Sequence, residues 1–429
     1  MDGETGGRTI AIVRRRLIPF MFLLYIVAYL DRINIGFAAL QMNRDLGFGD
    51  AVYGLGAGVF FIGYVLFEVP SNLVLHRVGA RRWIARIMIT WGAVSASMMF
   101  VRTAPAFYAM RFLLGVAEAG FFPGMLLYLT RWFPARERAH AVALFMTATA
   151  IAGLIGGPVS GALLQLQGTG GLAGWQWLFL LEGLPAALLG VVVWFYLTEG
   201  PETAGWLPPA EREWLVARLG RERELEGTTG CPSVRGVLAS GRVWALGVLY
   251  FLLVTAMYGV AFWLPQIVRN LSGLGDVGVG LVSAIPYLLA AVCMVPVAKH
   301  SDATGERRWH VAAPAAFGAA AMLGTAAVSS PVPGLVLLSC AAIGIWSALG
   351  PSWALPMSVL SGRGAAAGLA LINSVGNVGG FVGPSLVGLA REMTRSFAGG
   401  MLVIAASLVA AAALALALPH EHVPDRGAL

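Results

Sequence analysis

The chain has 429 residues, of which 58% are hydrophobic and only 12% charged, with a mean hydropathy of +0.76. Soluble globular proteins carry about 25% charged residues because they need a polar exterior, so this composition excludes a soluble globular protein. The net charge of +7 falls in short segments between apolar runs, which argues against nucleic-acid binding, and three scattered cysteines are too few for a disulfide framework or a metal site.

Long apolar runs recur along the whole chain and are bounded by charges or by Gly and Pro. A hydrocarbon core about 30 Å thick needs about 20 such residues in a helix. Met1–Arg16 lacks the apolar core and cleavage site of a signal peptide, so we expect the first helix to be retained. The first half is predicted to hold helices near 17–39, 51–75, 83–102, 105–130, 139–164 and 175–198.

The connection 199–241 is rich in Arg and Glu and contains a Pro start followed by an amphipathic stretch, Pro208–Trp214. We interpret it as a cytosolic linker helix between an N-terminal bundle, 1–198, and a C-terminal bundle, 242–429. The second half is predicted to hold helices near 242–268, 277–298, 309–329, 333–359, 364–390 and 396–418. The expected fold is therefore an all-α membrane protein with twelve transmembrane helices.

The distribution of Lys and Arg sets the expected orientation. If the N-terminus is cytoplasmic, 22 of the 29 basic residues fall on the cytoplasmic side, five fall on the opposite side, and Arg32 and Arg111 fall inside helices. By the positive-inside rule, both termini are predicted to be cytoplasmic.

An internal repeat with one constant offset of 226 residues relates the two halves. Asp50 and Gly54 align with Asp276 and Gly280, and the pair Gly157-Pro158 aligns with Gly383-Pro384. Because six predicted helices separate the copies, both have the same orientation in the membrane. Such parallel repeats are typical of transporters that bind substrate at mid-membrane between their halves.

Ionisable residues inside the predicted helices are concentrated in the first half. A charge at the bilayer centre costs about 2.5–3.5 kcal/mol or more, so each such residue is a functional candidate. With a rise of about 1.5 Å per residue, Asp31, Arg32 and Arg111 lie at similar depth, and Glu118 lies two turns beyond Arg111 on the same face. Asp31 and Arg32 point about 100° apart, so we expect Asp31 to pair with Arg111 across two helices.

Two buried arginines at one depth suit an anionic substrate, because a guanidinium binds a carboxylate through two parallel hydrogen bonds. Asp31 or Glu118 would stay charged while it faces an arginine and would take a proton when the substrate occupies that arginine. This predicts proton–anion symport. Polar-tipped aromatics and amides, including Tyr29, Tyr64, Trp353 and Asn373, would complete the pocket. Glu182 is interpreted as structural.

Five segments carry recognisable motifs: Tyr29–Asn34 (YLDRIN), Phe60–Asn72 (FFIGYVLFEVPSN), Arg111–Gly124 (RFLLGVAEAGFFPG), Gly174–Pro185 (GWQWLFLLEGLP) and Leu371–Pro384 (LINSVGNVGGFVGP). Together they resemble the helix signatures of the anion:cation symporter family within the major facilitator superfamily, over essentially the whole chain. His76–Arg82 is similar to the superfamily's loop motif, with His76 where Asp is usual, and the second copy keeps Asp302.

That family moves organic anions inward with protons, including sugar acids, tartrate, phthalate and other aromatic acids. The resemblance implies that Asp31 and Glu118 are the proton-coupling acids. It implies substrate or coupling roles for Arg32, Tyr64, Arg111, Trp353 and Asn373, with Tyr29 as a weaker candidate. Gating or structural roles are expected for Glu68, Arg77, Arg81 and Asp302.

Two alternatives on the same fold stay open. Gly153, Gly157-Pro158 and Gly161 resemble the helix motif of drug:proton antiporters, although Arg32 and Arg111 would repel lipophilic cations. A phosphate-ester exchanger would also use paired arginines. We expect no enzyme, because no ATP-binding loop, metal cluster or nucleophile constellation is present in the sequence.

The remaining expectations follow from a proton-coupled symporter. The protein would use the proton gradient and no cofactor, its partners would be a small organic anion, protons and the lipid bilayer, and it would be a monomer. It would be a multi-pass protein of the bacterial inner membrane.

Overall fold

The computed structural model describes residues 2–134, 137–138, 141, 145, 148–227, 239–359 and 363–419. Every regular element in these ranges is a helix. The chain divides into two compact units: unit 1 is Met1–Met42 with Val59–Thr229, and unit 2 is Asn43–Gly58 with Gly230–Leu429. Helix α2 (Asp50–Val78) therefore starts in unit 2 and continues in unit 1.

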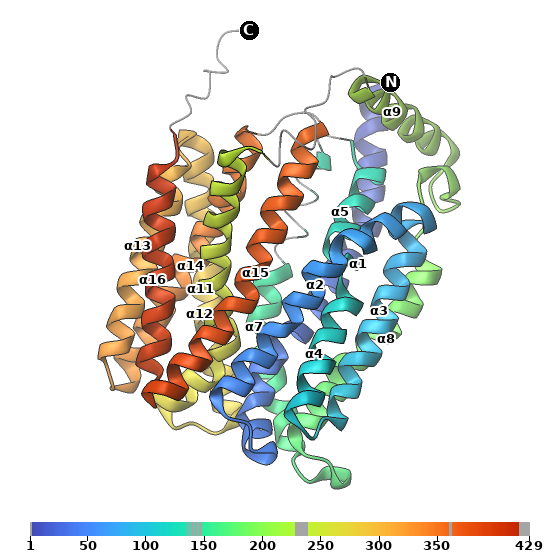
Figure 1. Cartoon of the computed structure of the whole chain (residues 1–429). Coiled ribbons are helices and arrows are strands. Elements are labelled where there is room, and N and C mark those ends of the chain that lie inside the picture. The colour runs from blue at the N-terminus through green and yellow to red at the C-terminus, as the bar shows by residue number, and fades with distance from the viewer. Residues whose placement is uncertain are drawn as a thin grey trace. The chain divides into compact units, whose positions relative to one another are not determined.

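Unit 1 begins with a helix much longer than predicted, α1 (Asp2–Leu46), which starts fifteen residues before the expected position 17. Its first turns contact the linker helix, where Arg8 forms an ion pair with Glu211 at 3.4 Å and Gly6 lies against the Trp214 ring. These contacts extend the helix beyond the apolar run that the sequence marks. The other helices of unit 1 are α3 (Ala80–Ser97), α4 (Ala104–Glu118), α5 (Phe121–Trp132), α7 (Ala148–Leu163), α8 (Gly174–Tyr196) and α9 (Pro209–Gly227) (Figure 1).

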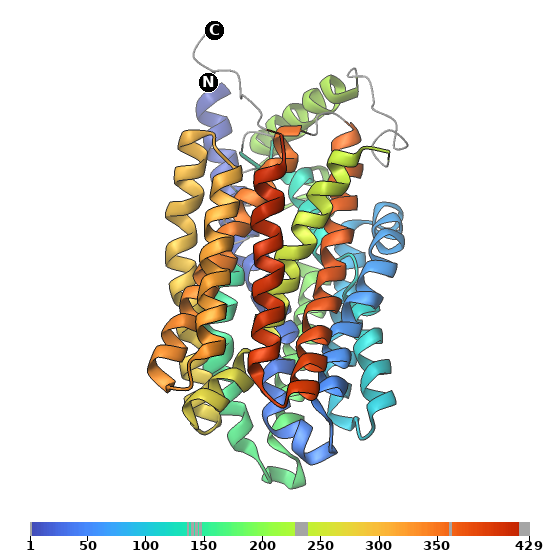
Figure 2. The same cartoon turned by 60° about the vertical axis from the view of Figure 1, so that its left-hand side comes forward.

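The described residues of unit 2 form six long helices besides the start of α2. They are α11 (Gly241–Ser272), α12 (Asp276–Thr304), α13 (Arg308–Ala327), α14 (Pro331–Val359), α15 (Arg363–Thr394) and α16 (Phe397–Ala417). Within the unit, α13 lies beside α14 and α16, and α15 lies beside α11 (Figure 1, Figure 2).

Ten spans of the described residues are long and apolar enough to cross a membrane. They are α2, α3 with its short 3-10 extension, α4 together with α5, α8, and α11 to α16. Helices α1 and α7 overlap the spans predicted at 17–39 and 139–164 but are not among the ten, and α7 has only 16 residues. The protein is thus all-helical and multi-pass.

Glycines allow the helices of unit 1 to touch backbone to backbone. A Cβ added at Gly115 of α4 would lie 1.9 Å from the Phe60 carbonyl oxygen of α2, and one at Gly63 of α2 would lie 2.4 Å from the Phe112 carbonyl oxygen of α4. Between α3 and α8, a Cβ at Gly92 would lie 2.4 Å from the Ala187 nitrogen. Small residues at such crossings are the usual means by which membrane helices approach closely. They hold α2 against α4 and α3 against α8.

We expect Gly115→Ala to destabilise unit 1, because its methyl group would meet the Phe60 backbone oxygen and force α2 and α4 apart. Overpacking of this kind costs about 1–3 kcal/mol. Thermal unfolding of the detergent-solubilised protein should show a lower midpoint. The matched control is Gly220→Ala in α9, where nothing lies within 4 Å of the added Cβ. Equal stability of the two variants would contradict the close contact.

In unit 2, the Asp50 end of α2 is fastened to α15. Asp50 Oδ1 forms an ion pair with Arg391 Nη1 at 2.8 Å, and the Ala51 backbone N–H donates to Glu392 Oε2 at 2.7 Å. Arg391 also donates to Gln266 Oε1 of α11 at 3.0 Å. The repeat marker Asp50 therefore ties the start of α2 to α15 and, through Arg391, to α11. Its counterpart Asp276 likewise forms an ion pair with Arg269.

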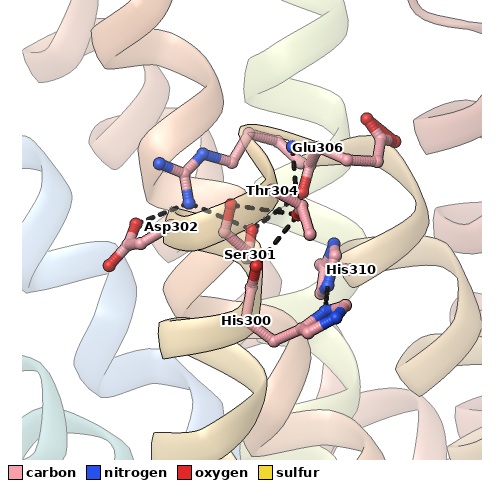
Figure 3. A network of polar contacts seen from close by, with 7 residues as sticks. His300, Ser301, Asp302, Thr304, Glu306 and His310 are labelled. Carbon is pink, nitrogen blue, oxygen red and sulfur yellow. Dashed lines mark hydrogen bonds and ion pairs between the residues drawn. The ribbon is translucent and has the colours of Figure 1, made fainter.

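The loop between α12 and α13 is the second copy of the loop motif (Figure 3). Arg307 Nη1 contacts Asp302 Oδ1 at 2.6 Å and donates to Ser301 Oγ at 3.0 Å, and Ser301 Oγ donates to the Glu306 carbonyl oxygen at 2.9 Å. Beside them, His300 Nδ1 and His310 Nε2 share a hydrogen bond of 2.7 Å. Asp302 thus joins the two ends of the loop through Arg307, and its gating or structural role stays a prediction.

Candidate functional site

The ion pair that the structure shows between α1 and α4 joins Arg32 to Glu118. Glu118 is 1% exposed, and the Arg32 side chain is 12% exposed. The pair expected from helix phase alone was Asp31 with Arg111. The sequence gives the angle between neighbouring side chains on one helix but not the rotation of that helix against its partner, and here the rotation turns Arg32 toward Glu118.

Asp31 is held by neutral donors from two helices. Its Oδ2 accepts a hydrogen bond from the Trp91 indole N–H of α3, and its Oδ1 accepts bonds from the Ser95 hydroxyl and from Asn34 Nδ2, the latter at 2.9 Å. Asp31 is 1% exposed. Both oxygens of this carboxylate are therefore satisfied at membrane depth, which an ionised group in such a place requires.

Arg111 is fully buried, and its positive charge acts on both Asp31 and Glu118. The guanidinium carbon lies 5.2 Å from the centre of the Phe60 ring, and that of Arg32 lies 5.5 Å from the centres of the Phe60 and Tyr64 rings. Cations over aromatic faces are stabilised by the ring quadrupole. Phe60 is thus in contact with both arginines in unit 1, and Tyr64 with Arg32.

The predicted 105–130 helix is broken directly after Glu118. Helix α4 ends at Glu118, Ala119 has a non-helical backbone, Gly120 has a left-handed conformation with φ of +86°, and α5 starts at Phe121. Ser71 Oγ of α2 donates to the Ala119 carbonyl oxygen, which the break leaves outside the helical ladder, at 2.6 Å. Broken membrane helices are tolerated where neighbouring groups satisfy the freed backbone, and they recur at transporter binding sites.

Tyr64 lies with these charges, whereas Tyr29 lies elsewhere in unit 1. Tyr29 is buried in an apolar cluster with Ile33 of α1 and Ala152 of α7. Glu68 is 5% exposed and one turn beyond Tyr64, on which its charge acts. The structure thus groups five of the predicted residues: Asp31, Arg32, Tyr64, Arg111 and Glu118. We call these five the charged cluster.

The two predicted binding residues of the second half lie in unit 2. Trp353 of α14 packs edge-on against Tyr250 of α11, with ring centres 4.9 Å apart. Asn373 lies on α15. Their roles in substrate binding stay predictions.

The predicted loop residues of unit 1 lie beside the start of α3. Arg81 Nε lies 3.8 Å from Glu199 Oε1, and its backbone N–H donates to Glu199 Oε2. Arg131, at the end of α5, lies 3.8 Å from the same carboxylate, while Arg77 is exposed. Glu199 therefore ties two helix ends together, a partner that the motif alone did not identify.

Reasoning from charge missed the polar partners of the acids. Trp91, Ser95, Asn34 and Ser160 all bond to buried carboxylates, and Ser160 Oγ donates to Glu182 Oε1 at 2.8 Å. The available signal was the presence of Ser and Asn inside apolar runs, where a polar group needs a partner. In the described residues, no group of three or more His, Cys, Asp and Glu side chains is placed to hold a metal ion.

The charged cluster carries two positive and two negative charges when both acids are ionised, so its net charge is zero. One proton on either acid leaves a net charge of +1, which a singly charged anion would neutralise. In such an arrangement, binding of a proton and binding of an anion would favour each other, by thermodynamic linkage.

Comparison with known proteins places the chain in a family. The sequence profile of the Major Facilitator Superfamily matches residues 21–384. A protein of Agrobacterium vitis named "Putative tartrate transporter" is 50% identical over 427 residues, covering 100% of this chain and 98% of that protein. A "Quinolone resistance transporter" of Acinetobacter baumannii is 42% identical over 401 residues, covering 94% and 92%.

The fold agrees with this assignment. The crystal structure of a bacterial homologue of the human lysosomal transporter Spinster, in an inward-facing and occupied conformation, matches with a TM-score of 0.74 at 17% identity, covering 94% of this chain and 95% of that one. The relatives are transporters and not enzymes, as the sequence predicts. The chain belongs to the Major Facilitator Superfamily, and its motifs and relatives fit the anion:cation symporter branch.

Proposed function

We propose that the protein is a secondary active transporter that carries a small organic anion into the cytoplasm together with protons. The single observation that supports this best is the charged cluster of unit 1: Arg111 is fully buried, Arg32 is paired with Glu118, and Asp31 has its own donors. Buried arginines suit a carboxylate, and the adjacent acids suit a proton. The relative named for tartrate transport supports a dicarboxylate or hydroxy acid as the substrate class.

The proposal gives each residue a role. Arg111 would bind a substrate carboxylate, and Arg32 would join it when Glu118 takes a proton and releases the ion pair. Asp31 would keep the charge balance of the cluster through its bonds to Trp91 and Ser95. Trp353 and Asn373 of unit 2 would contact the substrate. The protein would have twelve transmembrane helices with both termini in the cytoplasm, and it would lie in a bacterial inner membrane.

A drug:proton antiporter is the second candidate, and it is favoured by one observation, the 42% identity to a protein named for quinolone resistance. The buried Arg32 and Arg111 oppose a lipophilic cation. They do not oppose a drug that carries a carboxylate. The two candidates therefore differ in the direction of transport, inward or outward, as well as in the substrate.

The test is uptake of a panel of labelled organic acids into proteoliposomes, with and without an inward proton gradient. One proton per monoanion supports about tenfold accumulation for each pH unit, because one unit corresponds to about 1.4 kcal/mol. We expect one acid, with tartrate in the panel, to accumulate and to be lost on adding a protonophore. Proton-driven movement of a quinolone or a lipophilic cation, without uptake of any acid, would replace symport by the second candidate.

A further inference from the structure

Glu182 of α8 is a buried acid to which the proposed transport cycle gives no role. It is 7% exposed and lies inside a membrane-spanning helix. The neighbouring Gly183 presses α8 onto α3, since a Cβ there would lie 2.6 Å from the Ala96 nitrogen. This close approach brings the Glu182 carboxyl into the polar group formed by Asp31, Asn34, Ser95 and Ser160.

The surroundings of Glu182 do not suit a negative charge. Ser160 Oγ donates to its Oε1 at 2.8 Å, but Oε2 is buried and accepts no hydrogen bond from the described residues. No Arg, Lys or His side chain described in the structure is within ion-pair distance of it, and the charge that acts on it is the negative one of Asp31. An ionised carboxylate buried with one unpaired oxygen and a second anion nearby is costly.

Asp31 presents the opposite case, and Asn34 connects the two acids. Both oxygens of Asp31 accept hydrogen bonds, three in all. Asn34 Nδ2 donates to Asp31 at 2.9 Å, and the Asn34 side chain also lies near the Glu182 carboxyl. Asn34 Oδ1 itself is buried and has no partner in the described part of the chain. The hydrogen-bond donors are thus unevenly shared between the two acids. Asp31 accepts three bonds, whereas Glu182 Oε2 and Asn34 Oδ1 each lack a donor among the described residues.

A proton on Glu182 would satisfy both buried oxygens that lack a partner in the described ranges, Glu182 Oε2 and Asn34 Oδ1. It turns Oε2 from an acceptor without a donor into a donor, and Asn34 Oδ1 is a buried acceptor in the same group. It also sets the charge of the neighbourhood. With Glu182 ionised, Asp31, Glu118 and Glu182 together would outnumber Arg32 and Arg111 and give a net charge of −1, which opposes an anionic substrate. With Glu182 neutral, the charged cluster stays balanced at zero.

We propose that Glu182 is a second proton-binding site of unit 1, which holds a proton while Asp31 is ionised and exchanges it during transport. Asn34 is the positioning residue between the two acids. The ligand is the proton alone, bound at Oε2 from water and released to water. The exchange step rests on the proposed function, whereas the protonated state of Glu182 does not.

The protonated state is tested by infrared spectroscopy of the purified full chain in liposomes at neutral pH. We expect the difference spectrum between wild type and Glu182→Gln to show loss of the carbonyl stretching band of a protonated carboxylic acid. The control is Glu202→Gln, an exposed residue of the 201–203 turn, which should lose carboxylate bands instead. Loss of carboxylate bands in Glu182→Gln would overturn the proposal. Should that variant not fold, Ser160→Ala keeps the acid and should shift its carbonyl band to higher frequency; an unshifted spectrum would overturn it equally.

The exchange step is tested by transport in the same liposomes. We expect Glu182→Gln to lose most of the gradient-driven accumulation and to keep substrate counterflow, and Glu182→Asp to recover part of the accumulation. Accumulation equal to wild type in Glu182→Gln would show that the proton stays bound throughout and would overturn this step. If the wild type moves no organic acid at all, the proposed function fails, while the infrared result still decides whether Glu182 binds a proton.

Discussion

We expect Glu118→Gln to abolish proton-driven accumulation of the substrate while substrate exchange continues. Gln has the shape of a protonated Glu and cannot release a proton, so the variant would stay in the state in which Arg32 is free of its anionic partner. With an inward gradient of one pH unit, accumulation should fall from about tenfold to none, since each unit supplies about 1.4 kcal/mol per proton. Uptake and counterflow in proteoliposomes measure the two activities separately.

The control for this variant is again Glu202→Gln, which removes one acid from an exposed position outside the charged cluster. It should match wild type in both assays. Gradient-driven accumulation that persists in Glu118→Gln would remove Glu118 from the coupling mechanism and leave Asp31 as the candidate. Loss of exchange as well as accumulation would assign Glu118 to substrate binding instead.

We expect Arg111→Lys to weaken binding of the organic acid by roughly 10- to 100-fold, because a bidentate guanidinium is replaced by a single ammonium and a hydrogen bond to a charged group contributes about 1.5–3 kcal/mol. Arg111 is fully buried over the Phe60 ring, and Lys keeps the positive charge that acts on Asp31 and Glu118. Titration calorimetry of the detergent-solubilised protein gives the dissociation constant directly.

Arg44→Lys is the matched control, since its side chain is 76% exposed and pairs with its neighbour Asp45. It should bind the acid as wild type does. Unchanged affinity in Arg111→Lys would mean that the guanidinium serves to balance the two acids and does not touch the substrate.

Much of the fold could be predicted from the sequence because the bilayer imposes a strong and simple rule on helix length. The repeat markers Asp50 and Asp276 both have ion-pair partners in unit 2, which agrees with their equivalence in the repeat. The predicted start of the first helix, residue 17, was wrong, because α1 begins at Asp2. Contacts of Arg8 and Gly6 with the linker helix, and not hydropathy, determine where that helix starts. The number of transmembrane helices stays a prediction.

The sequence identifies which residues form the candidate site, but it does not show which of them pair with one another. Buried charges stand out in an apolar sequence, so Asp31, Arg32, Arg111 and Glu118 were identifiable. Which acid faces which arginine depends on helix rotation, and this depends on glycine contacts such as Gly115 against Phe60 that no single sequence reveals. The neutral donors were missed for a different reason: Trp91 and Ser95 are common in membrane helices and gain significance only when a carboxylate lies beside them.

The break between α4 and α5 gives unit 1 a hinge at the residue where proton coupling is proposed. Bending at Ala119 and Gly120 sacrifices no further helical hydrogen bonds, because the ladder is already interrupted there and Ser71 holds the free carbonyl. The left-handed Gly120 is a conformation that residues with a Cβ rarely adopt. Glu118 is the last residue of α4, directly before this break, and Arg111 lies two turns earlier in the same helix. A change in the direction of α5 would therefore begin beside the proposed proton-coupling acid and leave Arg111 in place.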